Sequence, residues 1–176
     1  NQNDLSLIEK NFKIGKIYSF SGIKKGIENT NYLIKTNKKK IILTIFEKRV
    51  QKKDLPFFMN LMFGLSRQKI KCPEPIKNKR GKYLFKIKNK TACLVSFLEG
   101  KDKNQLTNKD CFQIGKNAAL LHLAAKKLRL HRKNSLSVSS WGPLLNRIDK
   151  RINKLSNNLI KTMKTDLVDI KKKWPK

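Results

Sequence analysis

Residues that could act on a phosphate group gather in one short stretch of the chain. Gly26 is followed by Asn29 and Asn31, and these open a strand-like run that ends at a lysine-rich turn, 37–40. A second strand-like run, 41–47, comes directly after the turn. Two such runs predict an antiparallel hairpin, and a glycine in front of it lets the backbone approach a phosphate because glycine has no side chain.

The surrounding residues predict a sheet that holds this hairpin. Further strand-like runs occupy 16–21, 82–87 and 91–98. The run 41–47 is apolar on both of its alternating faces, which predicts a central strand buried on two sides. After it, Asp54 can cap a helix that carries Pro56 in its first turn and ends near Lys69. The apolar residues of this helix recur at steps of three and four and can cover the sheet: Leu55, Phe58, Met59, Met62 and Phe63.

The period of the apolar residues changes after Gly100. Thr107 and Asp110 form a capping-box-like start for a helix of about 20 residues. Its apolar stripe consists of Cys111, Ile114, Ala118, Leu121, Ala125 and Leu128. A serine-rich loop and two weaker helices are expected next, at 135–140, 143–156 and 159–173 respectively. The apolar stripes of these helices need a partner that the chain does not supply, which predicts an incomplete helical lobe.

The net charge of the 176 residues is +30, and lysine supplies nearly all of the positive charge. Basic side chains neutralise phosphates and release counterions, so a polyanion partner is one interpretation. Proteins that read nucleic acids favour arginine for base and phosphate contacts and interleave aromatic residues for stacking. Arginine is rare here, so the composition does not favour a dedicated nucleic-acid function.

Cysteine and histidine give no metal-binding pattern. The three cysteines are scattered along the chain: Cys72, Cys93 and Cys111. Their odd number and spacing predict reduced core residues. His122 and His131 lie nine residues apart without a further ligand at metal-binding spacing, so we expect no metal site. No apolar run approaches the roughly 20 residues of a membrane span, and segment 1–10 lacks the apolar core of a signal peptide, which favours a cytoplasmic protein.

Three further segments complete a resemblance to a known family. They are 54–58 (Asp-Leu-Pro-Phe-Phe), 72–75 (Cys-Pro-Glu-Pro) and 96–100 (Ser-Phe-Leu-Glu-Gly). With them, the chain closely resembles the amino-terminal half of homoserine kinases, the family built on the aminoglycoside and choline kinase fold. The resemblance implies a protein-kinase-like α+β fold, in which a five-stranded antiparallel sheet and one helix form a small nucleotide-binding lobe, 1–98. It also implies that 99–176 holds the hinge and the first helices of an α-helical large lobe, truncated, so that the chain is an amino-terminal fragment.

The resemblance also implies which residues contact ATP, which lies between the lobes in this fold. It places Gly26 in the turn over the phosphates, and Asn29 and Asn31 close to the nucleotide or bracing its loop. The alternative is that both asparagines only cap the turn and begin the strand. At the hinge, Ser96 and Leu98 would offer backbone groups to adenine, and the alternative there is an ordinary strand-to-helix connection.

The third strand departs from the usual pattern of the fold. Most of these kinases hold the nucleotide phosphates with a lysine on that strand, paired with a glutamate on the inserted helix. Here Thr44 stands on the strand, and the helix region 54–68 contains no glutamate. Homoserine kinases resemble the chain at this same position. Thr44 could donate its hydroxyl to a phosphate oxygen, although filling a strand face is the preferred interpretation.

No catalytic or metal-binding residue is predicted within the chain. In the family that it resembles, the catalytic loop and the magnesium-binding aspartate come after a tryptophan-proline pair like Trp174-Pro175. The aspartates of the second half have neither an adjacent histidine nor a following asparagine: Asp102, Asp110, Asp149, Asp166 and Asp169. His122 resembles a histidine that braces the catalytic loop, which is a structural role. The chain by itself is therefore expected to be inactive.

The expected function is that of the front part of an ATP-dependent homoserine kinase. The whole enzyme would use ATP and Mg²⁺ to convert L-homoserine to O-phospho-L-homoserine in threonine biosynthesis. One alternative is another small-molecule kinase of the same fold, acting on choline, an aminoglycoside or methylthioribose. Two others are a non-catalytic basic module that binds polyanions and a short inactive relative that serves as a scaffold. No specific nucleic acid and no membrane is expected as a partner.

Overall fold

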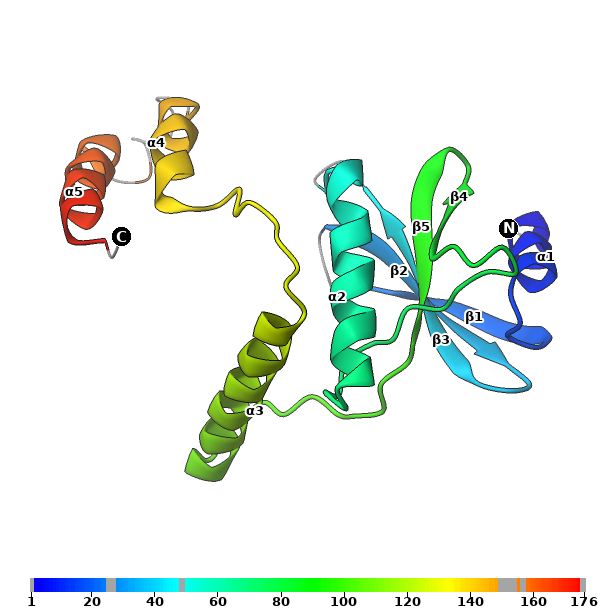
Figure 1. Cartoon of the computed structure of the whole chain (residues 1–176). Coiled ribbons are helices and arrows are strands. Elements are labelled where there is room, and N and C mark those ends of the chain that lie inside the picture. Colours follow the sequence, from blue (N-terminus) through cyan, green and yellow to red (C-terminus); the bar gives the residue numbers. More distant parts are fainter. Residues whose placement is uncertain (1, 25–27, 48–49, 149–154, 156–157, 175–176) are drawn as a thin grey trace. The chain divides into compact units, whose positions relative to one another are not determined.

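The computed structural model of the chain describes residues 2–24, 28–47, 50–148, 155 and 158–174 (Figure 1). Contacts within the chain divide it into two compact units, Asn1–His131 and Arg132–Lys176. Among the described residues, the first unit contains a sheet, three α-helices and a 3-10 turn, and the second contains two α-helices.

The sheet is antiparallel throughout and has five strands in the order β1-β2-β3-β5-β4. The strands are β1 (Ile17–Ile23), β2 (Asn29–Thr36), β3 (Lys40–Phe46), β4 (Leu84–Ile87) and β5 (Lys90–Ser96). The predicted hairpin is β2 and β3, and the structure confirms that β3 is the central strand. The sequence therefore predicted the sheet correctly in strand number and direction.

Short turns fix the register of the strands. Thr36, at the end of β2, is buried, and its hydroxyl accepts the backbone N–H groups of Lys38 and Lys39 at 3.2 and 3.0 Å. Between β4 and β5, Lys88 and Asn89 have φ angles of 45° and 65°. Two successive positive φ angles are typical of the tight hairpin turn whose twist matches that of the strands.

Helix α1 (Gln2–Asn11) covers one face of the sheet and was not predicted. The main core of the first unit lies beneath it, where Ile8 and Phe12 are 1% and 2% exposed. The strands contribute the other buried members of this core: Ile34, Ile41, Leu43, Ile87, Ala92 and Leu94, together with Ile14 before β1. Leu5, Ile8 and Phe12 are spaced at steps of three and four residues, which was the available signal for a helix.

Helix α2 (Leu55–Arg67) lies on the opposite face of the sheet, as Figure 1 shows. A 3-10 turn, Lys52–Asp54, precedes it, and Pro56 lies in its first turn as predicted. Asp54 occupies the N-cap position, but its backbone is already helical and its side chain makes no capping hydrogen bond, so the predicted capping role was wrong. The predicted apolar stripe packs on the sheet, with Phe58, Met59 and Met62 against Cys93 and Val95 of β5.

Helix α3 (Asn108–Lys127) begins with the predicted capping box. The backbone N–H of Asp110 donates to the Thr107 hydroxyl, and the Asp110 carboxylate accepts the backbone N–H of Thr107 at 2.8 Å. Its end packs on α2, where Gly64 lies against Leu128 and the Gln68 side-chain amide donates to the carbonyl of Ala124 at 3.0 Å. Much of the apolar surface of α3 stays exposed, including Phe112, Ile114 and Leu123 at 68%, 55% and 61%.

The close approach of α2 and α3 at Gly64 gives a test by glycine substitution. A methyl group added at Gly64 would lie 2.6 Å from a Leu128 methyl carbon, whereas one added at Gly115 of α3 meets nothing within 4 Å. We expect Gly115→Ala to stabilise the protein by about 0.5–1 kcal/mol, and Gly64→Ala to destabilise it by about 1–3 kcal/mol through overpacking. Urea denaturation measures both changes. Adding Leu128→Ala to Gly64→Ala should reduce the overpacking, and equal effects of the two glycine substitutions would contradict this account.

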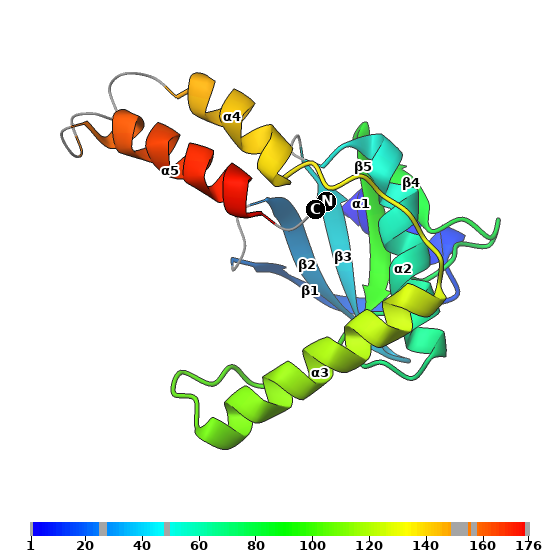
Figure 2. The ribbon, with the colours of Figure 1, turned by 60° about the vertical axis from the view of Figure 1, so that its left-hand side comes forward.

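The second unit consists of α4 (Val138–Asn146) and α5 (Leu159–Lys173), which run side by side in Figure 2. Leu145 and Leu167 are buried, and the rings of Trp141 and Trp174 meet edge to face at 5.7 Å. The prediction for α5 is confirmed. The prediction for the preceding helix was wrong in its bounds, because Pro143 lies inside α4 and not at its start. Ser139 and Ser140, predicted as loop, are helical, and part of 143–156 lies outside the described residues.

Candidate functional site

A cavity of about 580 Å³ lies on the α2 face of the sheet. Five of the six ligand-contacting residues predicted from the sequence line it: Asn29, Asn31, Thr44, Ser96 and Leu98. The sixth, Gly26, lies outside the described residues. The structure thus brings together residues that are up to 69 positions apart in the chain, since Asn29 and Leu98 line the same cavity.

Three polar side chains share this face because of the register of the hairpin. Asn31 pairs with Thr44, and Asn29 pairs with Phe46, so that alternate residues of β2 and β3 point to the same side. The Thr44 hydroxyl donates to the Asn31 side-chain carbonyl at 2.9 Å. The two side chains therefore form a neutral cross-strand pair on this face.

Asn29 differs from this pair because its side-chain carbonyl oxygen is buried and has no hydrogen-bond partner among the described residues. Leaving such a group unsatisfied costs about 1–3 kcal/mol. The amide also borders the cavity. The residue therefore offers an unused polar group at a place where a ligand could bind.

The apolar wall of the cavity comes from α2 and β5. Phe58, Met59 and Met62 of α2 face it together with Cys93 and Val95. None of these residues was predicted to line a site. For the three from α2, the apolar stripe of that helix was the available signal. Among the described residues that line the cavity, none is charged.

One end of the cavity, at the segment predicted to be a hinge, is formed by the residues at and after the end of β5. The backbone N–H of Ser96 donates to the Glu74 carbonyl at 2.8 Å, and the Ser96 hydroxyl accepts the N–H of Glu74 at 2.8 Å. Both of these groups of Ser96 are therefore already hydrogen-bonded to Glu74. Leu98, two residues farther along the chain, is 46% exposed and also lines the cavity.

The strand register gives the cavity two chemically different ends. Along β3, Ile42 is level with Val95 near the hinge, and Thr44 is level with Cys93, two residues farther away. Two residues of a strand span about 7 Å, and Asn29 lies a similar distance beyond Thr44. An apolar, hinge-side end and a polar far end suit an elongated ligand that has a flat apolar part and a polar tail.

The cysteines differ in burial, so the prediction of three core thiols was only partly correct. Cys93 is 2% exposed, and burial raises its pKa to about 12. Cys72 is half-buried, and its pKa is raised by burial and by the charge of Glu74. Cys111 is exposed in the first turns of α3, which corrects the prediction for that residue. All three are free thiols.

This difference predicts the order in which the cysteines react with iodoacetamide. We expect Cys111 to be alkylated within minutes at pH 8, because the thiolate is the reactive form and this thiol is accessible. We expect Cys93 to resist until the protein unfolds, since burial hides it and keeps it protonated. Mass spectrometry of peptides over time measures each rate. A Cys111→Ser variant is the control, and rapid alkylation of Cys93 in that folded variant would contradict the burial described here.

The described residues outside the cavity supply no obvious catalytic group. Asp110 serves the helix cap, and hydrogen bonds from Lys103 and then from Thr107 lower its pKa. His122 is exposed on α3. No group of three metal-binding side chains occurs in the part of the chain that the structure describes. Asp149 lies outside that part.

Comparison with known proteins decides the family. The model of the phosphotransferase enzyme family matches residues 19–171. This chain belongs to that family. Among the curated relatives of the chain, a homoserine kinase of Bartonella henselae is 37% identical over 98% of the chain and 54% of its own length. A homoserine kinase of Allorhizobium ampelinum is 38% identical over 100% of the chain and 55% of its own length.

The chain therefore spans about half the length of the curated relatives that it matches. Among solved structures, a spectinomycin phosphotransferase in complex with ADP and spectinomycin matches with a TM-score of 0.68. The match covers 99% of this chain and 59% of the other at 17% identity, and it confirms the predicted kinase-like fold. In the described residues of this phosphotransferase, no helix is both long enough and apolar enough to span a bilayer.

Proposed function

We propose that the chain is the nucleotide-binding part of an ATP-dependent homoserine kinase, which phosphorylates the side-chain hydroxyl of L-homoserine. Its products would be O-phospho-L-homoserine and ADP. The choice of substrate is supported by similarity to homoserine kinases along nearly the whole chain. The use of a nucleotide is supported by one observation above all, the cavity that unites Asn29, Asn31, Thr44 and Leu98.

The two ends of the cavity suit the two ends of ATP. Adenine would lie at the hinge against Ile42 and the main chain of Leu98, with α2 as the apolar cover. The phosphates would extend toward the Asn31–Thr44 pair and reach Asn29, whose side-chain carbonyl oxygen has no partner among the described residues, so that nothing there fixes the orientation of the amide. An asparagine amide carries both donors and an acceptor, so rotation of the amide presents N–H groups to a phosphate.

The phosphate contact in this lobe would be made without a lysine. The Thr44 hydroxyl donates its one hydrogen to the Asn31 side-chain carbonyl and so orients the amide, whose N–H groups can donate to a phosphate without bringing a positive charge. The described lining residues carry no carboxylate, so they supply no ligand for Mg²⁺. We propose that the magnesium ligands and the catalytic base belong to the half of the family's length that this chain does not span, and that residues 1–176 alone do not turn over ATP.

The same proposal assigns the lobes. Residues 1–98 would form the small lobe, and 99–176 would form the hinge and the beginning of the helical lobe. The second unit of the structure, from Arg132 onward, would belong wholly to that helical lobe. The protein would act in the cytoplasm.

The test is an assay of the full-length protein that contains this chain. We expect ATP consumption to depend on L-homoserine, with O-phosphohomoserine as the product seen by phosphorus NMR. Choline, kanamycin and spectinomycin are the competing acceptors. Faster turnover of any of these than of L-homoserine would replace the proposed substrate, and absence of ATP binding would overturn the proposal as a whole.

A further inference from the structure

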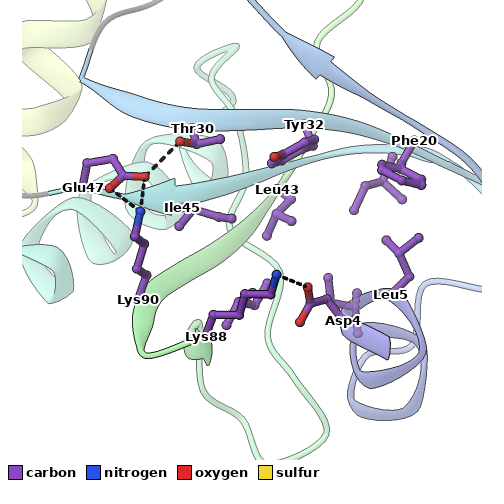
Figure 3. A pocket seen from close by; sticks show the side chains of 13 residues that line it. Asp4, Leu5, Phe20, Thr30, Tyr32, Leu43, Ile45, Glu47, Lys88 and Lys90 are labelled. Carbon is purple, nitrogen blue, oxygen red and sulfur yellow. Dashed lines mark hydrogen bonds and ion pairs between the residues drawn. The ribbon is translucent and has the colours of Figure 1, made fainter. Parts of the chain in front are cut away.

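A second cavity, of about 290 Å³, lies on the α1 face of the sheet (Figure 3). Its walls come from α1, from β1 to β3, and from the end of β4, the start of β5 and the turn between them. Because neighbouring residues of a strand point to opposite faces, this cavity shares its strands with the candidate nucleotide site but none of that site's lining residues. Nothing in the proposed phosphoryl transfer uses it.

One end of this cavity carries a closely matched pair of charges. The Lys90 ammonium donates to both carboxylate oxygens of Glu47, at 2.9 and 2.7 Å, and the Thr30 hydroxyl donates to one of them at 2.9 Å. The hydrogen bonds from Lys90 and then from Thr30 lower the pKa of Glu47, so its carboxylate is ionised at neutral pH. Figure 3 shows the three side chains converging at this end.

The floor beside this charge pair is apolar. Leu43 and Ile45 of β3 lie next to it, and Ile34 behind them is fully buried. The phenol hydroxyl of Tyr32 borders the cavity and makes no hydrogen bond to the described residues. At the far end Lys88, from the β4–β5 turn, lies 3.9 Å from Asp4 of α1. The cavity therefore joins a charged end to an apolar floor with one unused hydroxyl.

We propose that this cavity binds a small zwitterion with an apolar body, such as an α-amino acid with a branched aliphatic side chain. Its ammonium group would bind Glu47, its carboxylate would bind Lys90, and its side chain would lie on Leu43 and Ile45. This arrangement keeps every charge paired. An anion alone would leave its own charge beside Glu47, and a cation alone would leave its charge beside Lys90.

The size of the cavity limits the ligand. Pockets for small molecules usually span about 300–1,000 Å³, so 290 Å³ is at the lower end of that range. A single amino acid fits such a volume better than a nucleotide does. The proposal does not rest on the kinase assignment, because it concerns the opposite face of the sheet.

The first experiment varies the charge of the ligand and keeps its body constant. The full-length protein is titrated with L-leucine, with 4-methylpentanoate, which lacks the amino group, and with 3-methylbutylamine, which lacks the carboxylate. We expect leucine to bind at least about tenfold more tightly than either analogue, because each loses one charge-assisted hydrogen bond. The methyl NMR signals of Leu43 and Ile45 should shift, and those of Ile42 and Met59, on the other face, should not.

The second experiment exchanges the preferred charge by substitution. Glu47→Gln should weaken leucine binding about tenfold and leave 4-methylpentanoate as the better ligand, and Lys90→Met should favour 3-methylbutylamine in the same way. Glu99→Gln is the matched control, since Glu99 forms a similar ion pair with Lys40 at 2.7 Å outside this cavity. That variant should bind leucine as the parent protein does.

The results that would overturn the proposal are specific. Equal binding of the three ligands to the parent protein would overturn it, even if one of the variants failed to fold. Leucine-induced shifts confined to Ile42 and Met59 would assign amino-acid binding to the other face and would also overturn it. A protein that binds leucine here but phosphorylates no homoserine would refute the proposed function and leave this inference standing.

Discussion

Replacing Asn29 with leucine should stabilise the free protein by about 1–3 kcal/mol and weaken its binding of ATP about tenfold or more. The gain in stability is expected because the buried carbonyl oxygen of Asn29 has no partner among the described residues, and leucine has a similar size without a polar group. The loss in affinity is expected because the same amide would contact the nucleotide phosphates. A residue that contacts the ligand is expected to show this pattern, in which its replacement raises stability and lowers affinity for ATP.

Two measurements on the full-length protein test this prediction. Urea denaturation gives the change in the free energy of unfolding, and isothermal titration calorimetry gives the dissociation constant for ATP. Asn117→Leu on the exposed surface of α3 is the matched control, and it should change neither quantity appreciably. An unchanged ATP affinity in Asn29→Leu would show that the asparagine only begins the strand, which is the alternative raised by the sequence.

Replacing Ile8 with alanine should destabilise the protein by about 2–5 kcal/mol, as much as a substitution in a central strand. Ile8 is 1% exposed and belongs to the largest apolar cluster of the sheet. The adjacent residue, Leu7, is 44% exposed. Leu7→Ala should therefore stay within about 0.5 kcal/mol of the parent protein.

Thermal and urea denaturation of both variants measure this contrast. Similar small effects of the two substitutions would mean that α1 is not part of the cooperative core. The pair is informative because the two residues are neighbours in the same helix, so helix propensity changes little between them.

The sheet was predicted from the sequence and α1 was missed, because the signal for α1 is much weaker. Strands β3 and β5 are apolar on both faces, so their burial shows in a run of a few residues. Helix α1 has ten residues and only a few apolar positions, and a segment that short gains its stability from packing on the sheet. Helix α4 was expected at 143–156, whereas it begins at Val138 and contains Pro143 in its interior.

The candidate site was predictable in its polar part only. Asn31 and Thr44 lie in one hairpin, and the length of the hairpin turn sets the register that pairs them. The apolar cover from α2 and the trio of Thr30, Glu47 and Lys90 depend on contacts between distant parts of the chain. Lys90 is 43 residues from Glu47, and the pairing of β5 with β3 brings the two together. No local pattern in the sequence gives that pairing.

Helix α2 contains no acidic residue, and its later turns are fastened to α3 at Gly64 and Gln68. In kinases that pair a lysine of the third strand with a glutamate of this helix, moving the helix makes or breaks that pair and so turns the enzyme on or off. Here α2 has no such pair to make or break, and moving it would have to disrupt its packing on Leu128. We therefore expect α2 to keep a single position on the sheet.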